Sequence, residues 1–215
     1  MTGDVKRSYV SPLRNAAAAA TRQRILSAAK SVFEARGWAG TTMALIAAEA
    51  EVSPKTIQAQ FGTKARLLAD TVDFAIRGEP GSEPIVRKGA AQSIKESPDA
   101  RGALALHAAM SAGINSRAAQ LAAVVEAGAA SDLAVAPLWE RMRENMQFGV
   151  HWAAELMLSK PGLRPDLALQ EVETVLQLAM AWSTYRTLSS IRGMSEAQIG
   201  AWISRYYERM LLPAA

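Results

Sequence analysis

The residue types and spacing that suggest chemistry most clearly begin at Ser53. Ser53 is a favoured N-cap residue, and Pro54 suits the first position of a helix. Lys55 and Gln58 would then lie three residues apart on one helix face, where an ammonium and an amide can hydrogen-bond to base edges in a major groove. Lys64, just beyond this helix, is predicted to bind a phosphate. These residues predict recognition of DNA.

Two further helices must position this run. An apolar stripe at helical spacing predicts a first helix that Gly37 ends. Thr42 is predicted to cap a second helix, and Glu51 and Val52 alone separate its last residue, Ala50, from the cap of the third. Helices joined this tightly must cross steeply, which predicts a helix-turn-helix. The stripe on the first helix comprises Ile25, Ala28, Ala29, Val32 and Phe33.

The stretch from Ile25 to Leu68 resembles the N-terminal domain of the TetR family of bacterial transcriptional regulators. The matching string is ILxAAxxVF, then Gly37, TTMALIA, AEVSPKTI, and FGTK followed by a pair of leucines. The resemblance implies that Pro54, Lys55 and Gln58 read bases. It also implies a second set of residues that touch phosphates or cap helices, namely Thr42, Thr56, Gln60 and Lys64.

The chain departs from the family pattern in and around the recognition helix. Glu51 stands where the family usually has glycine, so a side chain is expected in a left-handed turn at a cost of about 1 kcal/mol. Gln58 stands where tyrosine is usual, and Gln60 where tyrosine or histidine is usual. Each glutamine keeps a hydrogen-bonding tip but lacks a ring. The operator sequences of other members therefore do not transfer to this chain.

Basic charge is concentrated in the N-terminal third of the chain. Through Arg77 there are 11 Lys and Arg against 6 Asp and Glu, which leaves 13 against 14 for the remainder. Clustered basic charge gives salt-dependent affinity for phosphates, and an ordinary solvated surface is the alternative reading.

Residues 1–20 are expected to form a basic N-terminal arm, because they contain too few apolar residues to fold alone. The arm either enters a minor groove beside the main site or stays unbound. Residues 16–20 are all alanine, so the first helix begins either near Asn15 or at Thr21. The basic residues of the arm are Lys6, Arg7 and Arg14.

Composition excludes several other classes of protein. The sequence has no cysteine, so disulfides and thiolate metal sites are excluded. No segment approaches the roughly 20 apolar residues that span a bilayer, and the basic start is not followed by the apolar core of a secretory signal. We expect a cytoplasmic protein without metal or cofactor. A helical enzyme is a remote alternative, because His107 and His151 are the sole histidines and no phosphate-binding glycine loop is present.

The predicted fold is all-α with two domains. A helix-turn-helix domain over 21–77 is followed by a linker over 78–84, which contains two prolines and two glycines, and by a larger C-terminal domain over 85–215. Helical periodicity continues throughout this second domain. The predicted helices cover 85–96, 99–115, 117–129, 133–158, 165–190 and 196–212.

The last two predicted helices each carry an apolar stripe that must be buried against another element. That element belongs either to the same monomer or to a second subunit. The resemblance implies the second subunit, because TetR-like proteins pair these helices across a dimer, and a two-fold dimer predicts a palindromic operator. The stripes contain Val172, Leu176, Ala179 and Met180 on one helix and Ile199, Trp202, Ile203, Tyr206 and Met210 on the other.

Apolar residues in the middle of the C-terminal domain predict a site for a small hydrophobic or aromatic effector, although core packing would give the same pattern. The resemblance implies a ligand pocket there that is coupled to DNA binding. His107 and Tyr185 are the polar residues that we expect to contact the ligand. We therefore expect a homodimeric repressor released from DNA by its ligand. The alternative is a constitutive DNA-binding regulator without an effector. The other predicted ligand residues are Met110, Ile114, Trp139, Met142, Met146 and Trp152.

Overall fold

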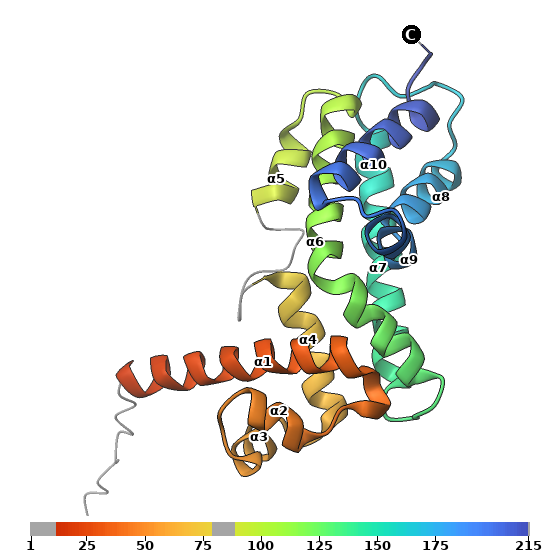
Figure 1. Ribbon diagram of the computed structural model, residues 1–215. Coiled ribbons are helices and arrows are strands. Elements are labelled where there is room, and N and C mark those ends of the chain that lie inside the picture. Colours follow the sequence, from red (N-terminus) through yellow and green to blue (C-terminus); the bar gives the residue numbers. More distant parts are fainter. Residues whose placement is uncertain (1–11, 79–88, 215) are drawn as a thin grey trace, which may run out of the picture.

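The computed structural model describes residues 12–78 and 89–214, and within them every regular element is helical (Figure 1). The all-α prediction is confirmed. An N-terminal module contains α1 (Pro12–Gly40), α2 (Met43–Glu49), α3 (Pro54–Phe61) and α4 (Lys64–Arg77). A C-terminal module contains α5 (Gly89–Glu96), α6 (Ala100–Ala129), α7 (Ala136–Leu158), α8 (Leu169–Met180), α9 (Trp182–Arg186), the π-helical turn η2 (Thr187–Ile191) and α10 (Glu196–Leu211).

The first helix is longer than the sequence predicts. It begins at Pro12, so the described part of the expected arm, which includes Arg14, is helical. The cause is local, because the five alanines at 16–20 have the highest helix propensity of any residue. Lys6 and Arg7 lie outside the described residues. Helical backbone angles stop at Gly37, whose φ of 66° and ψ of −175° turn the chain as predicted.

The helices α1 to α4 share one hydrophobic core, which continues into α6 and α7. Ile25 and Phe33 of α1, Ile46 of α2 and Ile57 of α3 are fully buried together. The predicted packing of α2 and α3 against the first helix is therefore confirmed, with Val52 packed partly buried at its edge. This core fixes α3 on the outer side of the module.

The helix α6 spans both modules. It is a single helix of 30 residues, whereas the sequence suggested an interruption at Ser116. Ser116 is tolerated because its hydroxyl donates to Gly113 O at 2.9 Å within the helix. The second half of α6 packs into the same cluster as α1 and α4, and its first half belongs to the core of the C-terminal module. Among the described residues, no helix has the length and apolarity needed to cross a membrane.

The predicted helix over 165–190 is divided in the structure. It starts at Leu169, and Ala181 breaks it with φ −55° and ψ 134° before α9 and η2 continue. Two side chains satisfy carbonyls freed by the break. Asn115 Nδ2 donates to Met180 O at 2.9 Å, and the Thr184 hydroxyl donates to Leu178 O at 2.7 Å. Periodicity could not predict this break, because no proline or glycine marks it.

Candidate nucleic-acid interface

The start of α3 has the capped geometry that the sequence predicts. Ser53 has an extended backbone, and its hydroxyl oxygen accepts the Thr56 N–H at 3.1 Å. The Ser53 and Thr56 hydroxyls are also hydrogen-bonded at 2.9 Å. Pro54 occupies the first turn, where its missing N–H costs nothing. The first turn of α3 is therefore fixed before any ligand binds.

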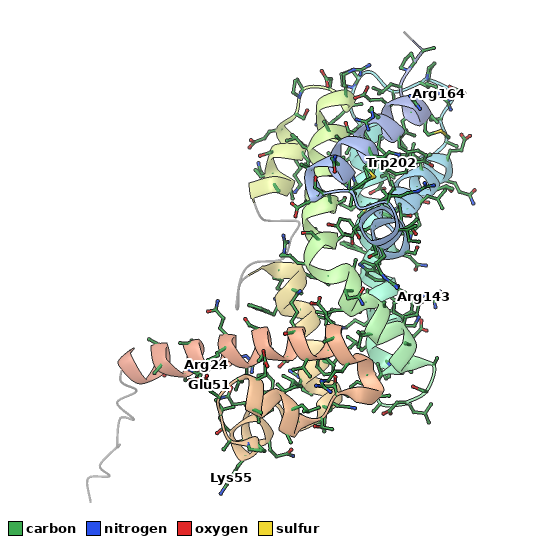
Figure 2. All side chains as sticks on the ribbon, viewed as in Figure 1. Arg24, Glu51, Lys55, Arg143, Arg164 and Trp202 are labelled. Carbon is green, nitrogen blue, oxygen red and sulfur yellow. The ribbon has the colours of Figure 1, made fainter. Side chains whose placement is uncertain are left out.

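The outer face of α3 carries the predicted base-reading side chains. Lys55 and Gln58 are exposed, while Ile57 on the opposite face is fully buried and Phe61 nearly so. Figure 2 shows Lys55 projecting away from the body of the module. Among the described residues, Lys55 has no hydrogen-bond or ion-pair partner. Its ammonium is therefore free to bind an acceptor on another molecule.

A tight turn sets the angle between α2 and α3. Glu51 has φ 52°, which confirms the prediction of a side chain in a left-handed turn. The turn is closed by the Val52 N–H, which donates to Ala47 O at 3.0 Å, and by the Glu51 N–H, which donates to Ala48 O at 3.2 Å. The Glu51 side chain is exposed. The connection between the two helices thus depends on a residue under local backbone strain.

Two other predicted contact residues border the same surface. Thr42 caps α2, because its hydroxyl oxygen accepts the Leu45 N–H at 3.2 Å, and its side chain is exposed. Gln60 is exposed near the end of α3. Both side chains are accessible to a phosphate without rearrangement of the helices.

Lys64 has a different environment from the one its predicted phosphate contact requires. Its ammonium donates to Trp38 O at 2.9 Å and to Thr41 O at 3.0 Å, and lies 3.9 Å from the centre of the Trp38 ring. Burial lowers the pKa of Lys64, and the Asp132 carboxylate acts in the opposite direction. Two of the three ammonium protons are thus engaged inside the protein, and we assign Lys64 a positioning role.

Arg22 makes a second positioning contact, which the sequence analysis did not predict. Arg22 Nη2 lies 2.6 Å from Asp70 Oδ2, and its guanidinium carbon lies 4.5 Å from the Phe61 ring centre. Arg66 Nε also pairs with Asp70 at 3.1 Å. Arg22 therefore joins α1 to α4 and covers the end of α3. Its partner is 48 residues away, so no local pattern could reveal the contact.

A groove of about 410 Å³ lies between α6, α7 and the broken α8–α9 segment. Trp139 and Trp182 form its aromatic part, with ring centres 5.7 Å apart and planes at 45°. Trp139 and Met146 are the predicted ligand residues that line this groove. Its wall is more polar than the sequence suggested. The polar lining residues are Glu126, Arg143, Gln147, Gln177, Ser183 and Arg186.

The other predicted ligand residues do not line this groove. His107 is buried, and its Nδ1 is hydrogen-bonded to the Tyr207 hydroxyl at 3.3 Å. Burial lowers the pKa of His107 to about 4, so the imidazole is neutral near neutral pH. Tyr185 is also largely buried, and burial raises the pKa of its hydroxyl because the charged form of tyrosine is the deprotonated one. Met142 is buried in the core, and three residues are partly buried against neighbouring helices, namely Met110, Ile114 and Trp152.

The structure divides the predicted dimer residues into two groups. Five of them are buried inside the monomer and offer no free surface to a partner, because α6 and α7 already cover these stripes. These are Val172, Leu176, Ala179, Ile199 and Ile203. The other four, Met180, Trp202, Tyr206 and Met210, are half-buried or exposed. Trp202, Tyr206 and Met210 follow one another at i, i+4 spacing along α10, and the Trp202 and Tyr206 rings are stacked.

The N-terminal module is similar to a known protein family. Residues 25–71 match the family model described as bacterial regulatory proteins, tetR family. A comparison with curated protein sequences gives no match.

Solved structures share the fold across both modules. A TetR transcription regulator from Haloarcula marismortui is 17% identical, with a TM-score of 0.62 over 89% of this chain and 98% of its own. NalD of Pseudomonas aeruginosa, the secondary repressor of a multidrug efflux pump, is 16% identical, with a TM-score of 0.67 over 91% and 99%. FadR of Bacillus subtilis, solved with stearoyl-CoA, is 17% identical, with a TM-score of 0.64 over 88% and 97%. These likenesses show a common fold.

Proposed function

We propose that this chain, whose residues 25–71 match the model of the TetR family of bacterial regulatory proteins, is a homodimeric repressor that reads a palindromic operator and is released by a small molecule. Regulators of this family are DNA-binding proteins without enzymatic activity, so the enzyme alternative is set aside. A repressor of bacterial genes acts in the cytoplasm, where the chromosome lies.

The exposed face of α3 carries the proposal. Lys55 and Gln58 project from a helix whose opposite face is buried and whose first turn is capped. A rigid helix that presents one ammonium and one amide fits a major groove, where guanine offers acceptors and adenine offers an acceptor and a donor. Thr42 and Gln60 flank this face and are proposed to contact phosphates.

Two copies are proposed to associate through the outer faces of α8 and α10. Trp202, Tyr206 and Met210 form a partly exposed apolar stripe on α10, and Leu178 of α8 is 56% exposed. Large exposed apolar side chains on adjacent elements are typical of association surfaces. The two α3 helices of a two-fold dimer would enter successive major grooves, so the proposed operator is a palindrome.

The groove between α6, α7 and α8–α9 is the proposed effector site. Its volume of about 410 Å³ is in the range of small-molecule pockets. Trp139, Trp182 and Met146 suit an aromatic or apolar body, while Arg186 is partly buried without an ion-pair partner among the described residues. The proposed effector is therefore amphipathic, with an apolar body and a hydrogen-bonding or anionic end.

A reporter gene tests repression. A duplex that the protein selects from random sequence is placed between a promoter and the reporter. We expect expression of the chain to lower reporter output. Raised output would identify an activator, and unchanged output would exclude this mode of control.

A pair of variants tests the effector site. Gln177→Trp places a bulky ring in the groove, and Gln170→Trp makes the same change on an exposed position of α8 outside it. A panel of amphipathic aromatic acids is screened for release of the wild-type protein from its duplex. We expect Gln177→Trp to bind the duplex but to resist release, and Gln170→Trp to behave as wild type. Release of both variants by the same compound would place the effector elsewhere, and no release of wild type by any compound would favour a constitutive regulator.

A further inference from the structure

Trp38 joins the end of α1 to the corner between α6 and α7. The left-handed Gly37 turns the chain so that the Trp38 ring stacks on Phe33, with centres 6.2 Å apart and planes at 9°. The indole Nε1–H donates to Asp132 Oδ2 at 3.2 Å, across 94 residues of sequence. Trp38 is only 9% exposed. The hydrogen bond from Trp38 to Asp132 thus links the two modules in largely apolar surroundings.

The surface of α6 is shaped to receive this ring. At Gly128 an added Cβ would lie 3.1 Å from Trp38 Cγ, 3.2 Å from its Cβ and 3.3 Å from Val135 Cγ1. Contacts this short are tighter than side chains normally accept, so a larger residue would push the ring away. The absence of a side chain at Gly128 therefore allows Trp38 to lie directly against the helix.

Lys64 connects the same ring to the recognition helix. It is the first residue of α4 and follows the end of α3 by three positions. Its ammonium binds Trp38 O and Thr41 O and covers the face of the Trp38 ring. Any displacement of Trp38 would therefore also displace Lys64, at the junction between α3 and α4.

Asp132 is itself rigidly placed. Its Oδ1 accepts the Ala134 N–H at 2.9 Å, and its own N–H donates to Gly128 O at 2.9 Å. At the other end of α4, Arg117 of α6 donates to Ala75 O at 3.0 Å. The C-terminal end of α4 is thus bonded directly to α6, and its N-terminal end reaches the loop after α6 through Lys64, Trp38 and Asp132. Figure 1 shows α4 lying alongside α6.

We propose that Asp132 is a positioning residue for DNA recognition, which holds Trp38 and Lys64 so that α3 keeps a fixed angle to the C-terminal module. The inference rests on the proposed reading of an operator by α3. Asp132 touches no DNA in this arrangement. Its loss would leave the basic surface intact but would let the two recognition helices of a dimer vary in their separation. Specific binding would then fall, because it needs both helices in register, while non-specific binding would persist.

Three substitutions separate this role from a general loss of stability. Asp132→Ala removes the acceptor for Trp38 and for the Ala134 N–H. Asp132→Asn keeps an acceptor oxygen and removes the charge. Asp99→Ala is the matched control, because Asp99 Oδ1 accepts the Gly102 N–H at 2.8 Å at the distant end of α6, away from Trp38 and Asp132. If Asp132→Ala does not fold, Trp38→Phe removes the same hydrogen bond from the other side.

Each protein is titrated by fluorescence anisotropy with a duplex selected by the wild type and with a random duplex of equal length. We expect Asp132→Ala to lose at least about tenfold in affinity for the selected duplex, with unchanged affinity for the random one. Asp132→Asn and Asp99→Ala are expected to keep the wild-type ratio. Equal losses on both duplexes, no loss, or the same loss in Asp99→Ala would overturn the inference. A wild-type protein without preference for any duplex would instead overturn the proposed function on which it rests.

Discussion

At the scale of single residues, Glu51 holds a backbone conformation that costs free energy. Its φ of 52° lies in the left-handed region, which glycine enters without penalty. We expect Glu51→Gly to raise the free energy of unfolding by about 1 kcal/mol, measured by urea denaturation. Ala48→Gly, at an exposed helical position three residues earlier, should lower it by about 1 kcal/mol. Destabilisation by both substitutions would show that the turn is not strained.

His107 predicts a pH dependence of stability. Burial lowers its pKa from 6.5 to about 4, so between these values the unfolded chain binds a proton that the folded chain excludes. Its contribution is therefore fully present above pH 6.5 and is lost as the pH falls towards 4. The expected loss is about 3 kcal/mol over this window.

The measurement is the free energy of unfolding across the window for wild type and His107→Asn. Asparagine retains a polar group beside Tyr207 but does not titrate. We expect a smaller loss of stability on acidification in the variant. His151 acts in the opposite sense, since its hydrogen bond to Glu173 raises its pKa, but it is present in both proteins and cancels in the comparison. Parallel pH profiles would contradict the assignment.

Residue roles were predictable where the partners are close in sequence. Ser53 and Thr56 are three positions apart, so the cap could be inferred from the local pattern, whereas the left-handed turn at Glu51 was predicted from the glycine that the TetR family usually has there. Lys64 could not be, because its acceptors lie 26 and 23 residues away. A lysine at the start of a helix predicts a cation on the surface. In the structure, the Lys64 ammonium instead donates hydrogen bonds to the Trp38 and Thr41 carbonyls.

At the scale of elements, the break between α8 and α9 depends on one donor from another helix. Asn115 is 3% exposed, and its amide satisfies Met180 O. We expect Asn115→Ala to lower the free energy of unfolding by about 1 to 3 kcal/mol, because the partly buried Met180 carbonyl would lose its partner. Thr184→Val removes a more exposed hydrogen bond to Leu178 O and should cost less. Denaturant unfolding measures both, and an equal or reversed order would show that Asn115 does not hold the break.

The same break marks the limit of prediction for elements. The sequence from 165 to 190 is periodic throughout, and its period predicts one helix. The structure ends α8 at Met180 because a side chain on α6, 65 residues away, stabilises the interrupted backbone. Apart from the start of α1, the boundaries of the N-terminal helices were predictable because each has its own signal, such as Gly37, Thr42 or Ser53.

At the scale of the whole molecule, the buried stripes on α8 and α10 account for the monomer core and leave the outer face of α10 for association. We expect Met210→Glu to weaken the dimer by placing a charge on that face, and Leu133→Glu, at a residue 90% exposed in the α6–α7 loop, to leave it intact. Light scattering on fractionated protein gives the molecular mass of each. A monomeric wild type, or a dimeric Met210→Glu variant, would place the interface elsewhere.

Recognition of a palindrome by paired α3 helices is the central claim, and selection of bound duplexes from random DNA tests it most directly. Wild type and Lys55→Ala are compared with Lys30→Ala, which removes a charge that is already paired with Glu34 at 2.8 Å in the same module. We predict that wild type and Lys30→Ala enrich the same palindrome, bound about 10³-fold or more above random DNA, and that Lys55→Ala changes the preferred base at symmetric positions. No enriched sequence, or an identical sequence for Lys55→Ala, would contradict this account.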